Sequence, residues 1–228
     1  MKSSIVFGSV QLVVNRFAQY GGAKGNRDIW YTQCSLSILG LEIMSVQVAK
    51  WTFTTDEYHL MVRAGILSEN DRVELIEGEI VKMSPIGSRH AACVKHLNSI
   101  LSKRLDRVIV SIQDPIVLND YSEPQPDVAL LKPRDDYYAG SLPTADDVLL
   151  IIEVADTSVE YDRNVKLPLY ARSHIPEVWL AVLPEDLVEA HSGPINGVYQ
   201  EVRYLHRGES ISPGNLPAFV LRVDDILG

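Results

Sequence analysis

The sequence is most apolar at Val148–Ala155, where eight consecutive residues read VLLIIEVA. The run is rich in β-branched side chains and is bounded by acidic and hydroxyl residues at 146–147 and 156–158. It therefore predicts a central strand that is buried on both faces and covered by helices. Glu153 is the one ionisable residue in the run. Because burying an unpaired carboxylate is costly, we expect Glu153 to meet a cation, a metal ion or a proton.

A short helix and a hairpin are predicted upstream of this strand. Residues 54–57 read TTDE and precede an apolar pattern with a glycine stop, which indicates a capped helix that ends near Arg63. Two β-type runs, 72–76 and 79–83, flank an acidic-glycine pair. That arrangement is a strong signal for a β-hairpin with a two-residue turn.

Between the hairpin and the central strand the sequence predicts a long helix and further strands. Residues 90–105 repeat apolar positions at nearly helical spacing and form the longest predicted amphipathic helix. Residues 108–118 are a candidate pair of strands, and residues 132–147 are a polar loop. Pro126-Asp127 opens a second buried strand at Val128–Leu131.

A third helix is predicted after the central strand, ending at Arg172. If it began near Val159, Pro168 would lie in its interior at a cost of about 3 kcal/mol, so a start near Asn164 or a kink is favoured. Later strands are predicted at 178–183, 198–205 and 218–223.

Composition indicates one globular domain. The chain has 228 residues, of which 46% are hydrophobic and 22% charged. The net charge of −9 argues against nucleic-acid binding by bulk electrostatics, although residues 86–107 carry five basic residues against one acid, a local charge of +4. Cys34 and Cys93 have no partners at zinc-ligand spacing, which excludes a zinc finger and fits a reducing cytoplasm.

The first 43 residues differ from the rest. They show no sustained period, and their apolar stretch at 5–14 is too short to span a membrane, so no membrane association is expected. We expect residues 1–43 to be a poorly ordered or non-native extension, with Met44 as the physiological start; a genuine accessory segment is the alternative. Residues 44–228 then form a single domain.

The order of the predicted elements resembles the PD-(D/E)XK nuclease superfamily and, more narrowly, the Uma-type family of endonucleases. The resemblance spans roughly residues 50–225, and its specificity comes from the order and spacing of motifs that are each weak alone. The motifs are ELIEGE at 74–79, His90, QPDV at 125–128, IEV at 152–154, DRNVKLPLYAR at 162–172 and IPEVWL at 175–180.

The resemblance implies a fold and a set of site residues. The fold is a restriction-endonuclease-like α/β core, in which helices flank a mixed central sheet, with an N-terminal β-hairpin and C-terminal strands. The superfamily pattern places an acid, then an acid and a lysine two residues apart on the next strand. Asp127 and Glu153 match the acids, but Ala155 occupies the lysine position. The resemblance implies that the lysine lies in the following helix as Lys166, 13 positions after Glu153 (166 − 153), as is typical of the Uma-type branch.

These residue types suit phosphodiester hydrolysis. Carboxylate oxygens are hard ligands, so Asp127 and Glu153 suit Mg²⁺ or Mn²⁺. Such a cation offsets charge on the phosphate and lowers the pKa of an attacking water. Lys166 could orient or activate water and stabilise the phosphate. Glu74 and His90 are candidate auxiliary residues.

Each candidate also has a structural interpretation. Glu153 could form a buried ion pair with a lysine or arginine, and Asp127 could begin a strand. Lys166 lies four residues after Asp162, a spacing typical of a surface salt bridge. Glu74 could face solvent, and His90 could cap its helix. Tyr170, one turn beyond Lys166, could be a core residue.

The leading hypothesis is a metal-dependent endonuclease that acts on DNA and could form a homodimer, since cutting both strands of a duplex often needs two sites. One alternative is a catalytically degenerate binding module, which the missing lysine at position 155 favours. The other is a metal-dependent hydrolase of small phosphoesters.

Overall fold

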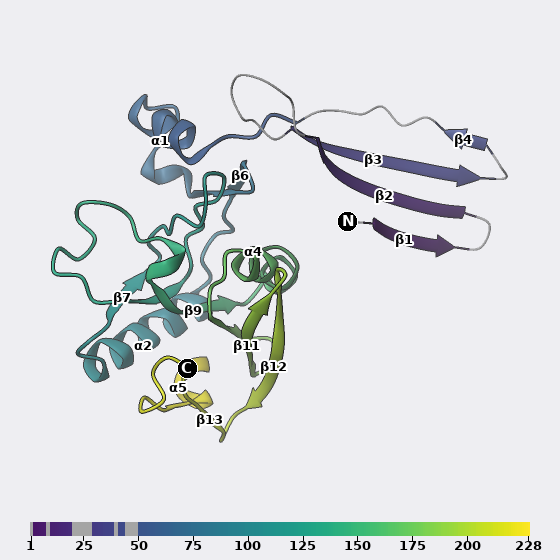
Figure 1. Cartoon of the computed structure of the whole chain (residues 1–228). Helices are drawn as coiled ribbons and strands as arrows, with labels where there is room; N and C mark the ends of the chain where they lie inside the picture. Colours follow the sequence, from purple (N-terminus) through teal and green to yellow (C-terminus); the bar gives the residue numbers. More distant parts are fainter. Residues whose placement is uncertain (1, 8–9, 20–28, 39–40, 44–49) are drawn as a thin grey trace. The chain divides into compact units, whose positions relative to one another are not determined.

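The structure is a computed structural model that describes residues 2–7, 10–19, 29–38, 41–43 and 50–228 (Figure 1). The chain divides into two compact units. The first comprises Met1–Phe53 with Glu77–Glu79, and the second comprises Thr54–Ile76 with Ile80–Gly228. Among the described residues, no helix is long and apolar enough to cross a membrane.

The first unit contains a four-stranded antiparallel sheet in the order β1-β2-β3-β4. Its strands are β1 (Lys2–Phe7), β2 (Val10–Gln19), β3 (Ile29–Ile38) and β4 (Leu41–Ile43). The predicted boundary at Met44 lies outside the described residues. That residues 1–43 form an extension beyond a single domain at 44–228 stays a prediction.

The second unit is built on a six-stranded mixed sheet in the order β12-β11-β10-β9-β8-β7. β9 and β10 run parallel, and the other neighbouring strands run antiparallel. The strands are β7 (Ile109–Ile112), β8 (Val128–Leu131), β9 (Val148–Ala155), β10 (Glu177–Val182), β11 (Leu187–Ile195) and β12 (Val198–His206). The predicted α/β fold with a mixed central sheet is confirmed.

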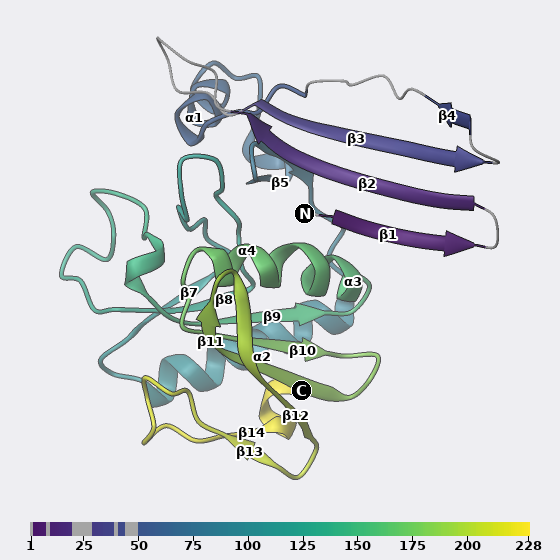
Figure 2. The ribbon, with the colours of Figure 1, turned by 45° about the vertical axis from the view of Figure 1, so that its right-hand side comes forward.

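β9 is the VLLIIEVA segment. It lies between β10 and β8 in the sheet, and helices cover both of its faces. α2 (Ser88–Arg104) and α5 (Val223–Leu227) pack on the face that carries Leu150, Ile152 and Val154. α4 (Leu167–Arg172) packs on the face that carries Ile151 and Ala155. Figure 2 shows β9 running between α2 and α4. Glu153 is thereby held on the α4 face, next to two apolar neighbours.

The predicted helix and hairpin upstream are also present. α1 (Thr55–Arg63) begins with a reciprocal capping box between Thr54 and Glu57. β5 (Val73–Ile76) and β6 (Glu79–Lys82) form a two-stranded sheet, and the turn residues Glu77 and Gly78 both have positive φ. Two short 3₁₀ turns, η1 (Glu69–Asp71) and η2 (Ala145–Asp147), complete the connections.

Two strand predictions are wrong. Residues 108–118 contain one strand instead of two: β7 pairs with β8 and ends before Gln113, a residue with a φ of 56°. The predicted strand at 218–223 is reduced to β14 (Leu221–Arg222), which pairs with β13 (Ser210–Ile211) and leads directly into α5. Its apolar residues pack as a loop and a helix turn against α2. Their apolar character therefore reflects burial in the core and not a β-strand conformation.

The helix after β9 begins at Val159, and the alternative start near Asn164 is wrong. α3 (Val159–Tyr161), the π-helical segment η3 (Asp162–Lys166) and α4 follow one another without a break. The Leu167 amide donates to the carbonyl of Asp162, five residues back. Since Pro168 has no amide hydrogen to donate, the wider π turn places the helix irregularity directly before it.

Candidate active site

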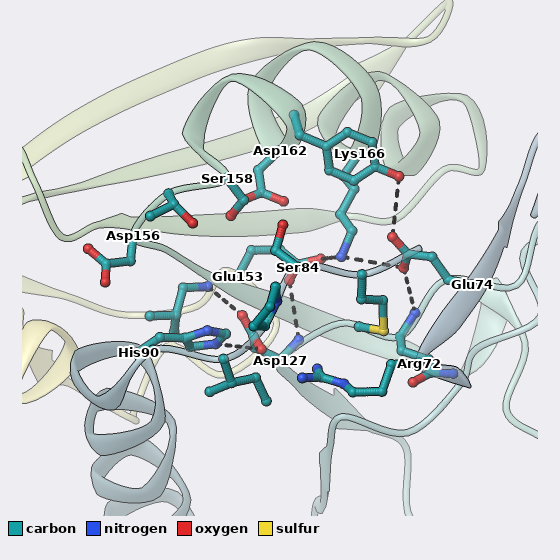
Figure 3. Close-up of a pocket in the computed structure, with 18 of the residues that line it drawn as sticks. Arg72, Glu74, Ser84, His90, Asp127, Glu153, Asp156, Ser158, Asp162 and Lys166 are labelled. Atoms are coloured by element: carbon teal, nitrogen blue, oxygen red, sulfur yellow. Dashed lines mark hydrogen bonds and ion pairs between the residues drawn. The ribbon is translucent and has the colours of Figure 1, made fainter. Parts of the chain in front are cut away.

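A cavity of about 480 Å³ opens in the second unit at the ends of β8 and β9 (Figure 3). Its walls come from the β5–β6 hairpin, the loop at 83–87, the first turn of α2, and the segment from α3 to η3. All five residues predicted from the sequence line it: Glu74, His90, Asp127, Glu153 and Lys166. The chain thus brings together groups that are up to 92 positions apart (166 − 74).

Asp127 lies immediately before β8 and is held by three donors. Its Oδ1 atom is 2.8 Å from His90 Nε2 and 3.0 Å from Gln113 Nε2, and its Oδ2 atom accepts the Val154 amide at 2.9 Å. Burial raises the pKa of Asp127, but the hydrogen bonds from His90, Gln113 and Val154 outweigh it and hold the pKa below its ordinary value. The hydrogen bond to Asp127 in turn raises the pKa of His90.

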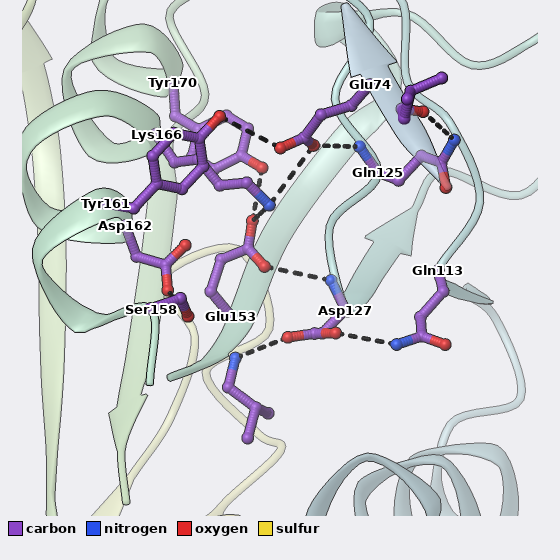
Figure 4. A network of polar contacts seen from close by, with 12 residues as sticks. Glu74, Gln113, Gln125, Asp127, Glu153, Ser158, Tyr161, Asp162, Lys166 and Tyr170 are labelled. Carbon is purple, nitrogen blue, oxygen red and sulfur yellow. Dashed lines mark hydrogen bonds and ion pairs between the residues drawn. The ribbon is translucent and has the colours of Figure 1, made fainter. Parts of the chain in front are cut away.

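Glu153 is almost completely buried and is also fully engaged. Its Oε1 atom accepts hydrogen bonds from Lys166 Nζ at 3.1 Å and from the Tyr170 hydroxyl at 2.6 Å, and its Oε2 atom accepts the Asp127 amide at 3.2 Å (Figure 4). Burial raises the pKa of Glu153, and Lys166 offsets only part of the effect. For Lys166, burial lowers the pKa, but Glu153, Glu74 and the neighbouring acids outweigh it and keep the ammonium charged.

Glu74 lies on β5 with its side chain buried rather than facing solvent. Its Oε2 atom is 3.6 Å from Lys166 Nζ and accepts a hydrogen bond from the backbone amide of Gln125 at 3.2 Å. Its Oε1 atom accepts a hydrogen bond from the Tyr161 hydroxyl at 3.2 Å. Lys166 is therefore bound between two carboxylates on different strands. Asp162 and Lys166 do not form the surface salt bridge that their spacing suggested, because Lys166 is buried against Glu153 and Glu74.

The structure adds residues that the sequence did not single out for the site. Tyr170 is a core residue, as one interpretation held, but its hydroxyl also reaches Glu153. Asp162 is a buried acid at the cavity that accepts a hydrogen bond from Ser158 at 2.6 Å. The four-residue spacing between Asp162 and Lys166 on one helix face could have predicted that Asp162 lies near the site. No sequence pattern could have predicted Gln113, because its contact with Asp127 depends on the irregular end of β7.

The donor atoms suit a divalent cation held by two carboxylates. Within the part of the chain that the structure describes, no three His, Cys, Asp or Glu side chains form a group that could hold a metal ion. Mg²⁺, however, is commonly bound through one or two carboxylates and keeps several waters. Asp127 Oδ2 and Glu153 Oε2 each accept one backbone amide and retain a lone pair. Figure 4 shows the two carboxylates side by side.

The basic residues of the 86–107 segment do not line the cavity. Arg89 and Arg104 donate to the carbonyls of Leu183 and Val220, at 2.6 and 2.7 Å. The cations at the cavity, besides Lys166 and His90, are Arg72 and Lys82.

Comparisons with known proteins agree with this fold. A family model named Uma2 and described as "Putative restriction endonuclease" matches residues 55–224. A crystal structure of a "putative nuclease belonging to DUF820" from Anabaena variabilis aligns with a TM-score of 0.59 at 19% sequence identity, covering 77% of this chain and 97% of that chain. At that identity the match shows a shared fold. No curated protein matches the sequence significantly.

Proposed function

The chain belongs to the Uma2 family of restriction-endonuclease-like proteins, and from that premise we propose that it is a metal-dependent endonuclease that hydrolyses phosphodiester bonds in DNA. Family membership and the nuclease-like fold support a nuclease in general terms. The observation that carries the finer proposal is the meeting of Asp127, Glu153 and Lys166 at one cavity. Two acids suit a hard divalent cation, and a buried ammonium beside them can stabilise negative charge on the phosphate.

In this proposal each residue has one role. Asp127 and Glu153 would hold Mg²⁺ or Mn²⁺ through their carboxylate oxygens. The bound cation offsets charge on the phosphate and lowers the pKa of the attacking water. Lys166 keeps its proton at neutral pH because the surrounding carboxylates raise its pKa, so it donates to the phosphate or orients water instead of removing a proton.

The other residues keep these groups in place. His90 and Gln113 fix Asp127 through its Oδ1 atom, which leaves Oδ2 directed toward Glu153 and the Val154 amide. Glu74 and Tyr170 flank the Lys166–Glu153 pair. Arg72 and Lys82, at the cavity, are suited to contact the phosphates on either side of the scissile bond.

Cleavage of supercoiled plasmid DNA with and without Mg²⁺ tests this function. We expect D127N, E153Q and K166M each to reduce the rate by about 100-fold or more, as removal of a positioned catalytic group does. K95M, which changes an exposed lysine on α2, is the matched control and should cleave normally. Unchanged cleavage by both carboxylate variants, with folding verified by circular dichroism, would refute the assignment.

Two measurements separate the remaining functions. Absence of Mg²⁺ binding in calorimetry would favour the non-catalytic binding module. Turnover of bis-p-nitrophenyl phosphate that is independent of added DNA, with no plasmid cleavage, would favour a hydrolase of small phosphoesters. Light scattering coupled to size-exclusion chromatography would show whether the chain forms the homodimer that cutting both strands favours.

A further inference from the structure

Two buried acids face the helix that carries Lys166. In the register of the sheet, Leu180 of β10 pairs with Glu153 of β9 on one side and with Glu189 of β11 on the other. Residues in register on neighbouring strands project from the same face. Glu153 and Glu189 therefore stand on the α4 face, about 10 Å apart across two strand spacings. Both are buried.

The π-helical segment η3 supplies one cation to each acid. Lys166 binds Glu153, as described above. Arg163, three residues earlier, donates from Nε to Glu189 Oε1 at 2.9 Å and from Nη2 to the same oxygen at 2.5 Å. Its Nη2 atom also donates to Glu185 Oε1 at 3.0 Å. The other carboxylate oxygen, Glu189 Oε2, lies 3.1 Å from Nε2 of His191 on the same strand.

These contacts keep Glu189 ionised beside Arg163. Burial raises the pKa of Glu189, but the hydrogen bonds from His191 and Arg163 outweigh it and lower the pKa below its ordinary value. The pair is thus a charged anchor between η3 and β11. Arg163 and Glu189 do not line the cavity and lie outside the group of side chains around Asp127 and Glu153.

The ion pair holds the helix where its geometry is irregular. π-helical turns are rare and appear mostly as single turns inside α-helices, frequently at functional sites. The rotation of η3 about its axis decides where the Lys166 ammonium lies. Arg163 ties the start of η3 to β11, and Lys166 at its end is bound to Glu153 on β9, so the two contacts together limit the rotation of η3 beyond what the packing of α4 already sets.

We propose that Arg163 and Glu189 are positioning residues, whose ion pair fixes η3 on the sheet and thereby holds the Lys166 ammonium against Glu153 and Glu74. The geometric part of this proposal stands on the contacts themselves, and its catalytic consequence rests on the proposed function of Lys166.

Amine labelling read by mass spectrometry tests the geometric part without any need for activity. In the R163M variant we expect Lys166 to be acetylated about tenfold faster or more than in the unaltered protein, because its segment opens locally. The exposed Lys82 and Lys95 should keep their rates. R163K, which retains the charge, should restore much of the protection. R207M, which breaks an exposed Arg207–Asp186 pair elsewhere, is the matched control.

Two labelling results would overturn the proposal. One is unchanged protection of Lys166 in R163M. The other is an equal increase in Lys166 labelling in R207M, which would indicate general loosening. Should R163M fail to fold, E189Q removes the charge of the partner with little change in shape and is judged by the same criteria.

Kinetics on plasmid DNA test the catalytic consequence. R163M should lower kcat by about tenfold or more with KM unchanged, and the loss should vanish in a K166M background because both changes act through one group. An equal loss in that background would contradict the proposal. If the unaltered protein cleaves no DNA, the proposed function fails, while the labelling result still decides the role of Arg163.

Discussion

At the scale of the residue, the acids around the cavity outnumber the bases that face them. Glu74, Asp127, Glu153 and Asp162 are all buried, and their main cationic partners are Lys166 and His90. Four carboxylates cannot all stay ionised in a buried site with so few positive charges unless a proton or a further cation joins them. This imbalance is the physical reason to expect a divalent cation at Asp127 and Glu153.

The pH dependence of stability follows from Glu153. Burial raises its pKa to about 8, above the value of about 4.3 in an unfolded chain. The folded state therefore binds more protons between these values, and the free energy of unfolding of the metal-free protein should fall as pH rises from about 4.3 through 8. The raised pKa of His90 acts in the same direction above about 6.5.

Thermal unfolding in the presence of a chelator checks this prediction. The melting temperature should decrease from pH 5 to pH 8, and E153Q should show a flatter profile. Added Mg²⁺ should recover stability most strongly at the upper end of the range, because the metal binds the deprotonated carboxylate. A melting temperature that rises steadily over this range would contradict the pKa shift.

Tyr170 should contribute more than an ordinary buried tyrosine. Its hydroxyl donates to the Glu153 carboxylate, whereas the hydroxyl of Tyr199, which is also buried, donates to the neutral carbonyl of Ile175 at 3.0 Å. Hydrogen bonds to charged groups are stronger, so Y170F should lower the free energy of unfolding by about 2 kcal/mol and Y199F by about 1 kcal/mol. Urea unfolding at pH 9, where Glu153 is ionised, measures both. Equal losses would show that the carboxylate is not charged.

At the scale of the element, the sequence predicted segments whose pattern is local. β8 and β9 match their predicted ranges, because an uninterrupted apolar run between turn residues is itself the signal of a buried strand. The β5–β6 hairpin was equally visible from its two-residue turn. β11 was missed, although Asn196-Gly197 between β11 and β12 is a strong hairpin signal.

Contacts between distant elements were harder to predict. The order of Glu74, Asp127, Glu153 and Lys166 followed from the resemblance, and the structure places all four at one cavity. The Arg163–Glu189 pair was not foreseeable, because it requires both the register of β9, β10 and β11 and the π turn of η3. Neither of these is encoded by a short motif.

The Asn196-Gly197 turn gives a prediction at this scale. Gly197 has a φ of +76°, and a Cβ atom there would lie 2.6 Å from Arg172 Cγ. G197A should therefore lower the free energy of unfolding by about 1–2 kcal/mol through backbone strain, while the flexible Arg172 side chain moves aside. G140A is the matched control, since Gly140 has no positive φ and its added Cβ would meet Asp136 Oδ2 at 3.4 Å. Equal stabilities for the two variants in urea unfolding would contradict the strain.

At the scale of the whole molecule, the second unit contains both the core and the site. The two hydrophobic clusters lie on opposite faces of the six-stranded sheet, and their described members all come from residues 93–227. Every described residue that lines the cavity belongs to residues 72–166. The described hydrophobic clusters and the residues of the proposed chemistry thus belong to the same part of the chain.

A shortened chain that begins at Met44 tests this division. We expect it to fold and to keep the melting temperature within about 3 °C, a loss of about 1 kcal/mol or less, since residues 93–227 supply the described members of both clusters. Its plasmid cleavage in Mg²⁺ should equal that of the full chain, because the described residues that line the cavity all remain. A shortened chain that unfolds or aggregates would show that residues 1–43 are needed for stability and would favour the accessory segment over the non-native extension.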